Sequence, residues 1–194
     1  MRAAQGYRKR TLARGSHLNA LLLLFAASMV GCRIGSFTDV RPHANRAACQ
    51  ENLKSIGAAL TKYVAAHNEL PRSSSGETSL TVAMQDPQVQ MELGVDATLL
   101  RCPGDASPAG MSYIFNPALT AADIAPDSTT VVACDRQPVH PGISGATDSP
   151  TSVILLGNGA VTTMYLPQEE REKWIKLFLA GDKRACTHPP EGKR

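Results

Sequence analysis

The chain has 194 residues, of which 43% are hydrophobic, and a formal net charge of +3. This length fits one domain with a core of its own. The positive charge is concentrated at the start, because five basic residues and no acid precede Cys32: Arg2, Arg8, Lys9, Arg10 and Arg14. The remaining chain has 15 basic and 17 acidic residues and a net charge of −2. Such a balance excludes a protein that binds nucleic acid through a broadly basic surface.

Residues 1–31 are predicted to be a signal peptide. A basic segment precedes the apolar run Leu18–Val30, whose 13 residues would span about 20 Å as a helix, less than the roughly 30 Å of a bilayer core. The run ends in Gly31-Cys32, which resembles the bacterial lipoprotein signal, although Met29 stands where Leu is usual. The resemblance implies that Cys32 is acylated and becomes the new N-terminus, with residues 32–41 as a tether. The alternative is an ordinary signal peptide followed by a coincidental cysteine.

A long helix is predicted between Pro42, which suits a first helical turn, and Asn68, which suits a left-handed end. Pro71 prevents its continuation. Its apolar residues recur at helical spacing and should form one buried stripe: Cys49, Leu53, Ile56, Leu60, Tyr63, Val64 and His67. The small residues 57–59 leave one flank of the helix thin, so another backbone can approach closely there.

The rest of the chain predicts further short helices and strands. We expect a helix within Leu80–Gly94, starting at Asp86-Pro87, and a second helix over Pro167–Ala180. In the second helix Trp174, Leu177 and Phe178 should dock on the domain, and residues 169–173 should be a solvated face. Apolar and β-branched runs predict four strands, with a hairpin at residues 157–159: Met111–Phe115, Thr129–Cys134, Ser152–Leu156 and Ala160–Tyr165.

These elements predict an α+β domain over residues 42–182, followed by a flexible tail over 183–194. A long N-terminal helix should pack on a small antiparallel sheet of three or four strands, with a C-terminal helix beside it. No internal repeat is found in the sequence.

Three segments together resemble the sequence pattern of a known protein family. They are the helix motif Cys49-x-x-Asn-Leu-Lys-x-Ile-Gly-x-Ala-Leu-x-x-Tyr63, the later Leu100–Asp105 and the Ser112-Tyr113 strand. Over residues 45–165 the chain resembles the globular part of type II secretion pseudopilins and a large family of bacterial pilin-like domains of unknown function. The resemblance implies a pilin-like head with a structural or interaction role and no catalytic activity. The apolar stem helix of pilins has no counterpart after Gly35–Val40.

Together, the predicted signal peptide and the family resemblance predict a lipoprotein of the cell envelope that faces the periplasm or exterior. Its partners would be membrane lipid, through Cys32, and envelope proteins of unknown identity. Two alternatives are a divergent type II secretion pseudopilin and an envelope hydrolase, which would need a polar pocket that the sequence does not indicate.

Four cysteines besides Cys32 are an even number in an exported chain, which suggests disulfides. Cys102–Cys134 is the favoured pair because both residues adjoin predicted sheet elements, and Cys49–Cys186 follows by elimination. The alternative is that all four are buried free thiols.

No metal, cofactor or catalytic residue is expected. A zinc site from Cys102, Cys134 and His140 lacks a C-x₂-C pair. The major pseudopilins bind calcium in a C-terminal loop. Asp135 and Asp148 lie in or next to such a loop here, but no tight run of oxygen ligands accompanies them. Residues 142–145 do not complete a G-x-S-x-G nucleophile motif.

Overall fold

The structure, a computed structural model, describes residues 40–105, 110–137 and 151–187. Its contacts divide the chain into two compact units, Met1–Phe37 and Thr38–Arg194, and all described residues belong to the second. The predicted leader, Cys32, His140, residues 142–145 and Asp148 lie outside the described residues.

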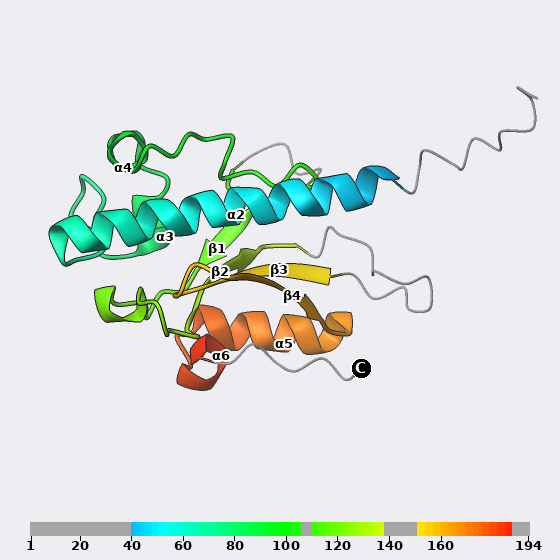
Figure 1. The fold of residues 1–194 in the computed structure, drawn as a ribbon. Coiled ribbons are helices and arrows are strands. Elements are labelled where there is room, and N and C mark those ends of the chain that lie inside the picture. Colours follow the sequence, from blue (N-terminus) through cyan, green and yellow to red (C-terminus); the bar gives the residue numbers. More distant parts are fainter. Residues whose placement is uncertain (1–39, 106–109, 138–150, 188–194) are drawn as a thin grey trace, which may run out of the picture. The chain divides into compact units, whose positions relative to one another are not determined.

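Helix α2, Val40–His67, covers one face of an antiparallel sheet, and the helices α5, Gln168–Leu179, and α6, Lys183–Thr187, cover the other face (Figure 1). The strands lie in their chain order: β1, Tyr113–Phe115; β2, Val131–Asp135; β3, Thr151–Leu156; β4, Val161–Tyr165. Each strand pairs antiparallel with the next. The predicted α+β class, with a long N-terminal helix on a small antiparallel sheet, is confirmed.

The buried stripe of α2 follows the predicted spacing. Cys49, Leu53, Ile56 and Leu60 are fully buried, and Val64 is nearly so. The helix starts at Val40, two residues before the predicted start, and it ends as predicted at Asn68, whose φ is 58°. The prediction was wrong for His67, which is exposed and contacts Tyr63 with 4.3 Å between the ring centroids, the two rings being tilted by 31°.

The predicted close approach occurs at Gly57. A Cβ atom there would lie 2.8 Å from Cδ1 of Leu155 on β3 and 3.7 Å from the Cα of Gly159. The missing side chain therefore lets the helix backbone rest directly on the sheet.

The β3–β4 hairpin turns through residues 157–159, as predicted. The N–H of Gly159 donates to the carbonyl of Leu156 at 2.9 Å, and only Gly159 in this loop has a positive φ, 79°. This is a three-residue loop with a glycine in the left-handed region at its end. Gly157 is required for a different reason, since a Cβ there would collide with the carbonyl oxygen of Asp123.

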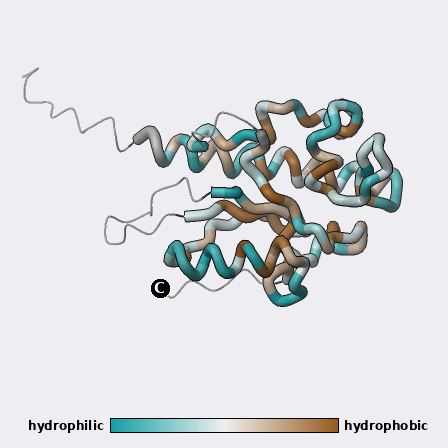
Figure 2. Tube along the Cα trace, turned by 180° about the vertical axis from the view of Figure 1, so that it is seen from behind, coloured by the Kyte–Doolittle hydropathy of each residue, from teal (hydrophilic) through white to brown (hydrophobic). Residues whose placement is uncertain are grey.

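Side chains of the sheet alternate between two buried clusters. In Figure 2 the hydrophobic parts of the chain, coloured brown, lie along the strands between the helices. The helix-side cluster, between α2 and the sheet, contains Tyr113, Phe115, Val153 and Leu155 among others. The opposite cluster, between the sheet and α5 and α6, contains a row of residues that are neighbours across three strands: Ile114, Cys134 and Ile154. The alternation is interrupted on β2, where the pairing register shifts between Val131 and Ala133.

Three short helices complete the described chain: α3, Leu80–Ala83; α4, Pro87–Leu93; and the 3₁₀ turn η1, Ala121–Asp123. Helix α4 begins and ends as predicted. The carboxylate of Asp86 accepts the N–H of Gln88 at 2.9 Å, and Gly94 ends the helix with a φ of 65°.

The predicted tail is wrong for Lys183–Thr187, which form α6. Ala185 and Cys186 are buried against the sheet, and the carboxylate of Asp182 accepts the N–H groups of Arg184 and Ala185 at 2.9 and 3.2 Å. A helix of five residues is too short to show helical periodicity in the sequence.

Candidate functional sites

The first candidate site is a buried charge network of Arg171, Asp135 and Ser152. Helix α5 carries Arg171 to the end of the sheet, where the side chain is only 5% exposed. Its Nε donates to the Ser152 hydroxyl at 2.6 Å, and its Nη2 donates to the carbonyl oxygens of Asp135 and Arg136 at 2.8 and 3.0 Å. The guanidinium thus joins β2, β3 and α5.

Asp135 balances this charge at the end of β2. Its carboxylate is 1% exposed, accepts the backbone N–H of Val153 at 3.1 Å and lies 3.8 Å from Arg171 Nη2. The calcium interpretation placed this acid in or next to a loop; the structure places it at the last position of β2, buried and facing a cation. Asp148, the other acid of that interpretation, lies outside the described residues.

The network does not resemble an activated nucleophile. A serine nucleophile needs a base that accepts its proton, but the Ser152 hydroxyl receives a hydrogen bond from a guanidinium, which is always protonated. Sequence analysis assigned Arg171 to a solvated face. Its spacing from Trp174 and Phe178, three and seven positions, was the signal that it shares their buried stripe. The prediction for Leu177 was wrong, since this side chain is half exposed.

The four cysteines of the domain are buried free thiols in this structure. Cys49 and Cys102 belong to the helix-side cluster, whereas Cys134 and Cys186 belong to the opposite cluster. Both predicted pairs, Cys102–Cys134 and Cys49–Cys186, are therefore divided by the sheet, and neither is present. The same division separates Cys102 and Cys134 as ligands of the conceivable zinc site, whose third ligand, His140, is not described.

Cys49 lies in a second candidate site with Cys102 and Tyr113. Its Sγ is 3.2 Å from the Tyr113 hydroxyl, and its thiol also contacts that of Cys102. The contact with Cys102 and burial raise the pKa of Cys49, and burial raises the pKa of Tyr113. Burial likewise raises the pKa of Cys134 and of Cys186. Uncharged thiols are poor nucleophiles, so Cys49, Cys134 and Cys186 are not activated cysteines.

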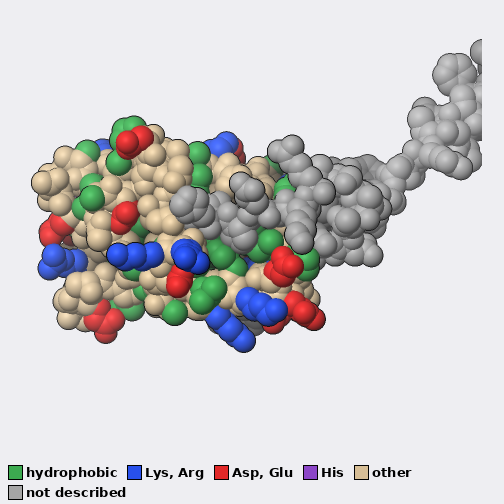
Figure 3. Space-filling model, turned by 90° about the horizontal axis from the view of Figure 1, so that it is seen from below, with side chains coloured by type: hydrophobic (Ala, Val, Ile, Leu, Met, Phe, Trp, Pro, Cys, Tyr) green, Lys and Arg blue, Asp and Glu red, His purple; other side chains and the backbone are tan. Residues whose placement is uncertain are grey.

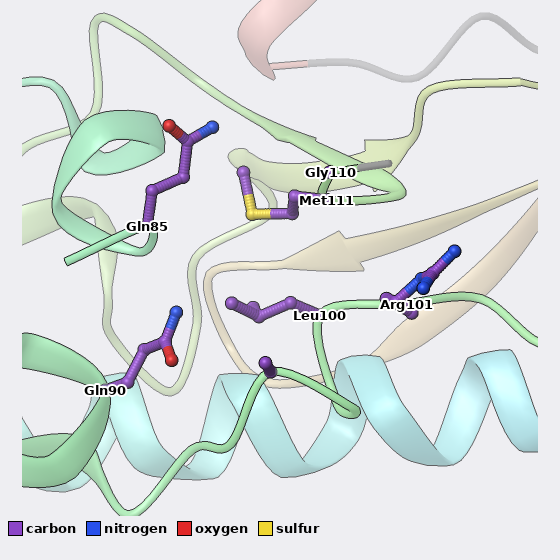
Figure 4. A pocket seen from close by; sticks show the side chains of 7 residues that line it. Gln85, Gln90, Leu100, Arg101, Gly110 and Met111 are labelled. Atoms are coloured by element: carbon purple, nitrogen blue, oxygen red, sulfur yellow. The ribbon is translucent and has the colours of Figure 1, made fainter. Parts of the chain in front are cut away.

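A pocket of about 260 Å³ lies between α3, α4 and the segment that leads to β1 (Figure 4). Arg101 is the one titratable side chain among the described residues of its wall, and the Gln90 amide donates to the Met84 carbonyl at 2.9 Å. Small-molecule sites are usually larger, about 300–1,000 Å³, and combine several polar groups. With Gln85, Gln90 and Arg101 as the polar side chains of its wall, this pocket lies just below that size range.

On the face of the domain that carries α5 and α6, Lys and Arg side chains are interspersed with Asp and Glu (Figure 3). Within the described ranges, no three His, Cys, Asp or Glu side chains gather as a metal site would require. None of the described helices is both long enough and apolar enough to cross a bilayer.

These features define the class: an α+β domain in which a long N-terminal helix rests on a four-stranded antiparallel meander, with the Arg171–Asp135 network and four thiols buried. The model of a bacterial family described as a protein of unknown function (DUF1559) matches residues 38–92, which contain α2, α3 and most of α4. The chain is thus similar to a bacterial family of unknown function. Searches of curated proteins and of solved structures find no match.

Proposed function

We propose that this chain is a lipoprotein of the bacterial cell envelope, held in the membrane by acyl chains on Cys32. Its domain would serve as a pseudopilin-like structural or interaction module without catalytic activity. Two or three acyl chains anchor a protein stably, because each buried CH₂ contributes about 0.8 kcal/mol.

The observation that carries this proposal is the start of α2. The helix begins at Val40, eight positions after Cys32, and its first buried side chain among the described ones is Cys49. The start of the helix, where His43 and Ala44 are exposed, therefore extends beyond the core at the end nearer to Cys32 in the chain (Figure 1), whereas residues 45, 46 and 48 are half-buried. The seven residues 33–39 reach about 25 Å at most when extended, which would keep the domain near the membrane surface.

The exposed start of this helix would supply the surface for an interaction. His43 and Ala44 are exposed and contribute nothing to the helix-side cluster. A helix that extends beyond its own core can pack against another helix, as the pilin resemblance implies. The buried charge network and the uncharged thiols support a role without catalysis, because both are engaged inside the fold.

Metabolic labelling with a fatty-acid analogue tests the anchor. Wild-type protein in a bacterial host should be labelled and recovered with membranes, whereas Cys32→Ala should lose almost all label. Cys186→Ala is the matched control and should keep the label, because Cys186 is buried inside the domain. Equal labelling of wild type and Cys32→Ala would refute the proposal.

A further inference from the structure

Two hydrogen bonds fix the segment before β1 against its neighbours. The side-chain amide of Asn52 on α2 donates to the carbonyl oxygen of Arg101 at 2.9 Å. The N–H of Ser112 donates to the carbonyl oxygen of Leu100 at 2.9 Å. Cys102 is therefore positioned by the residues that precede it, and Cys49 lies one helical turn before Asn52 on α2.

This placement brings two thiols together from distant parts of the chain. The side chains of Cys49 and Cys102 are in direct contact, 0% and 2% exposed, within the same cluster. Tyr113 closes the site, with its hydroxyl 3.2 Å from Cys49 Sγ and 3.5 Å from the Cys49 carbonyl oxygen. No such contact joins Cys134 or Cys186 to this pair, because both belong to the opposite cluster.

We propose that Cys49 and Cys102 form a disulfide bond that fastens helix α2 to the segment between α4 and β1. The bond would close the part of the chain that contains α3 and α4. It would also fix the wall of the pocket in Figure 4 at Leu100 and Arg101. The inference rests on the proposed envelope location only for access to an oxidising compartment.

The oxidant is a second disulfide, carried by a thiol oxidoreductase or by a small molecule. One cysteine, as its thiolate, attacks this disulfide, forms a mixed disulfide and releases one thiol. The other cysteine then attacks the mixed disulfide and releases the second thiol. Overall, two cysteine thiols and one disulfide give the Cys49–Cys102 bond and two thiols. Because both sulfurs are buried in the folded domain, the exchange must take place during folding or in an opened state.

The test uses the full chain, purified with reduced thiols in mild detergent. The protein is unfolded, refolded with a mixture of oxidised and reduced glutathione, and alkylated in denaturant. Digestion with trypsin and chymotrypsin separates the four cysteines, because cleavage after Tyr113 parts Cys102 from Cys134. Mass spectrometry should find the peptide of Cys49 joined to the peptide that begins at Cys102, two hydrogen masses below their sum.

Variants and melting temperatures complete the test. Cys134→Ser should keep the joined peptide, and Cys102→Ser should lose it. The oxidised wild type should melt about 5–15 °C above its reduced form, and this difference should vanish in Cys102→Ser. Alkylation of both Cys49 and Cys102, or a bond from Cys49 to Cys134 or Cys186, would overturn the inference. Because the readout is the residue joined to Cys49, and not the acylation of Cys32, failure of this experiment is distinguishable from failure of the proposed anchor.

Discussion

Arg171 is a buried positive charge in a stretch of sequence that predicts a solvent-exposed helix face. Its neighbours Glu172 and Lys173 are exposed, but its own guanidinium lies beneath the end of the sheet. Burying a charge is costly unless it is paired and hydrogen-bonded, and here Asp135, Ser152 and two carbonyl groups provide both. The contribution of this residue is to hold α5 in one position on β2 and β3.

The first stability prediction concerns this residue. Arg171→Met should lower the free energy of unfolding by about 3–5 kcal/mol, because it leaves the Asp135 carboxylate buried without its cation. Urea denaturation followed by circular dichroism measures the change. The control is Lys173→Met, two positions away and exposed, which should shift stability by less than about 0.5 kcal/mol. Similar losses in the two variants would show that Arg171 is not the buried partner of Asp135.

Among the elements, α2 depends most on shape complementarity. Its stripe supplies the apolar side chains, but the short distance between helix and sheet depends on Gly57 against Leu155. Helical periodicity predicted the stripe, and the small residues predicted the close approach. The strand on which Gly57 rests could not be predicted, because a contact between segments far apart in the chain leaves no local pattern in the sequence.

Replacing Gly57 by Val tests this packing. A Cβ there would lie 2.8 Å from Leu155 Cδ1, so the leucine must move or the helix must lift. Overpacking of this kind typically costs about 1–3 kcal/mol. Ala58→Val is the matched control, since it places the same branched residue at an exposed helical position. The Tm of Gly57→Val should fall clearly below that of the control, and equal values would contradict the close packing.

For the whole molecule, the α2–sheet interface is the principal core. Leu60 is fully buried there, and Lys62, two residues later, is exposed. Leu60→Asp should unfold the domain, because truncating a buried leucine alone costs about 2–5 kcal/mol and a lone buried carboxylate costs more. Domains of this size have a total stability of about 5–15 kcal/mol. Lys62→Asp should leave the thermal melt nearly unchanged, and equal shifts would show that the stripe is not the core.

The sequence predicted most of the architecture but not the pairing of its cysteines. Each strand has a run of apolar or β-branched residues long enough to recognise, and the glycines at 157 and 159 mark the hairpin. Which cysteines lie close enough to pair depends on the face of the sheet that each one occupies. Strict alternation counted from Val131 would place Cys134 on the α2 side, but the register shift after Val131 turns Cys134 to the α5 side. A single extra residue in a strand is not visible in composition or periodicity.

The packing of α2 on β3 also determines when the core can form during synthesis of the chain. Gly57 is synthesised about 100 residues before Leu155, the side chain on which it rests. At about 5–20 residues per second, α2 waits roughly 5–20 s for its sheet. During this interval its apolar stripe has no partner, and an isolated amphipathic helix is only marginally stable in water. Folding to the native core must therefore follow synthesis of the β3–β4 hairpin, and a chain truncated before Thr151 should remain a substrate for chaperones.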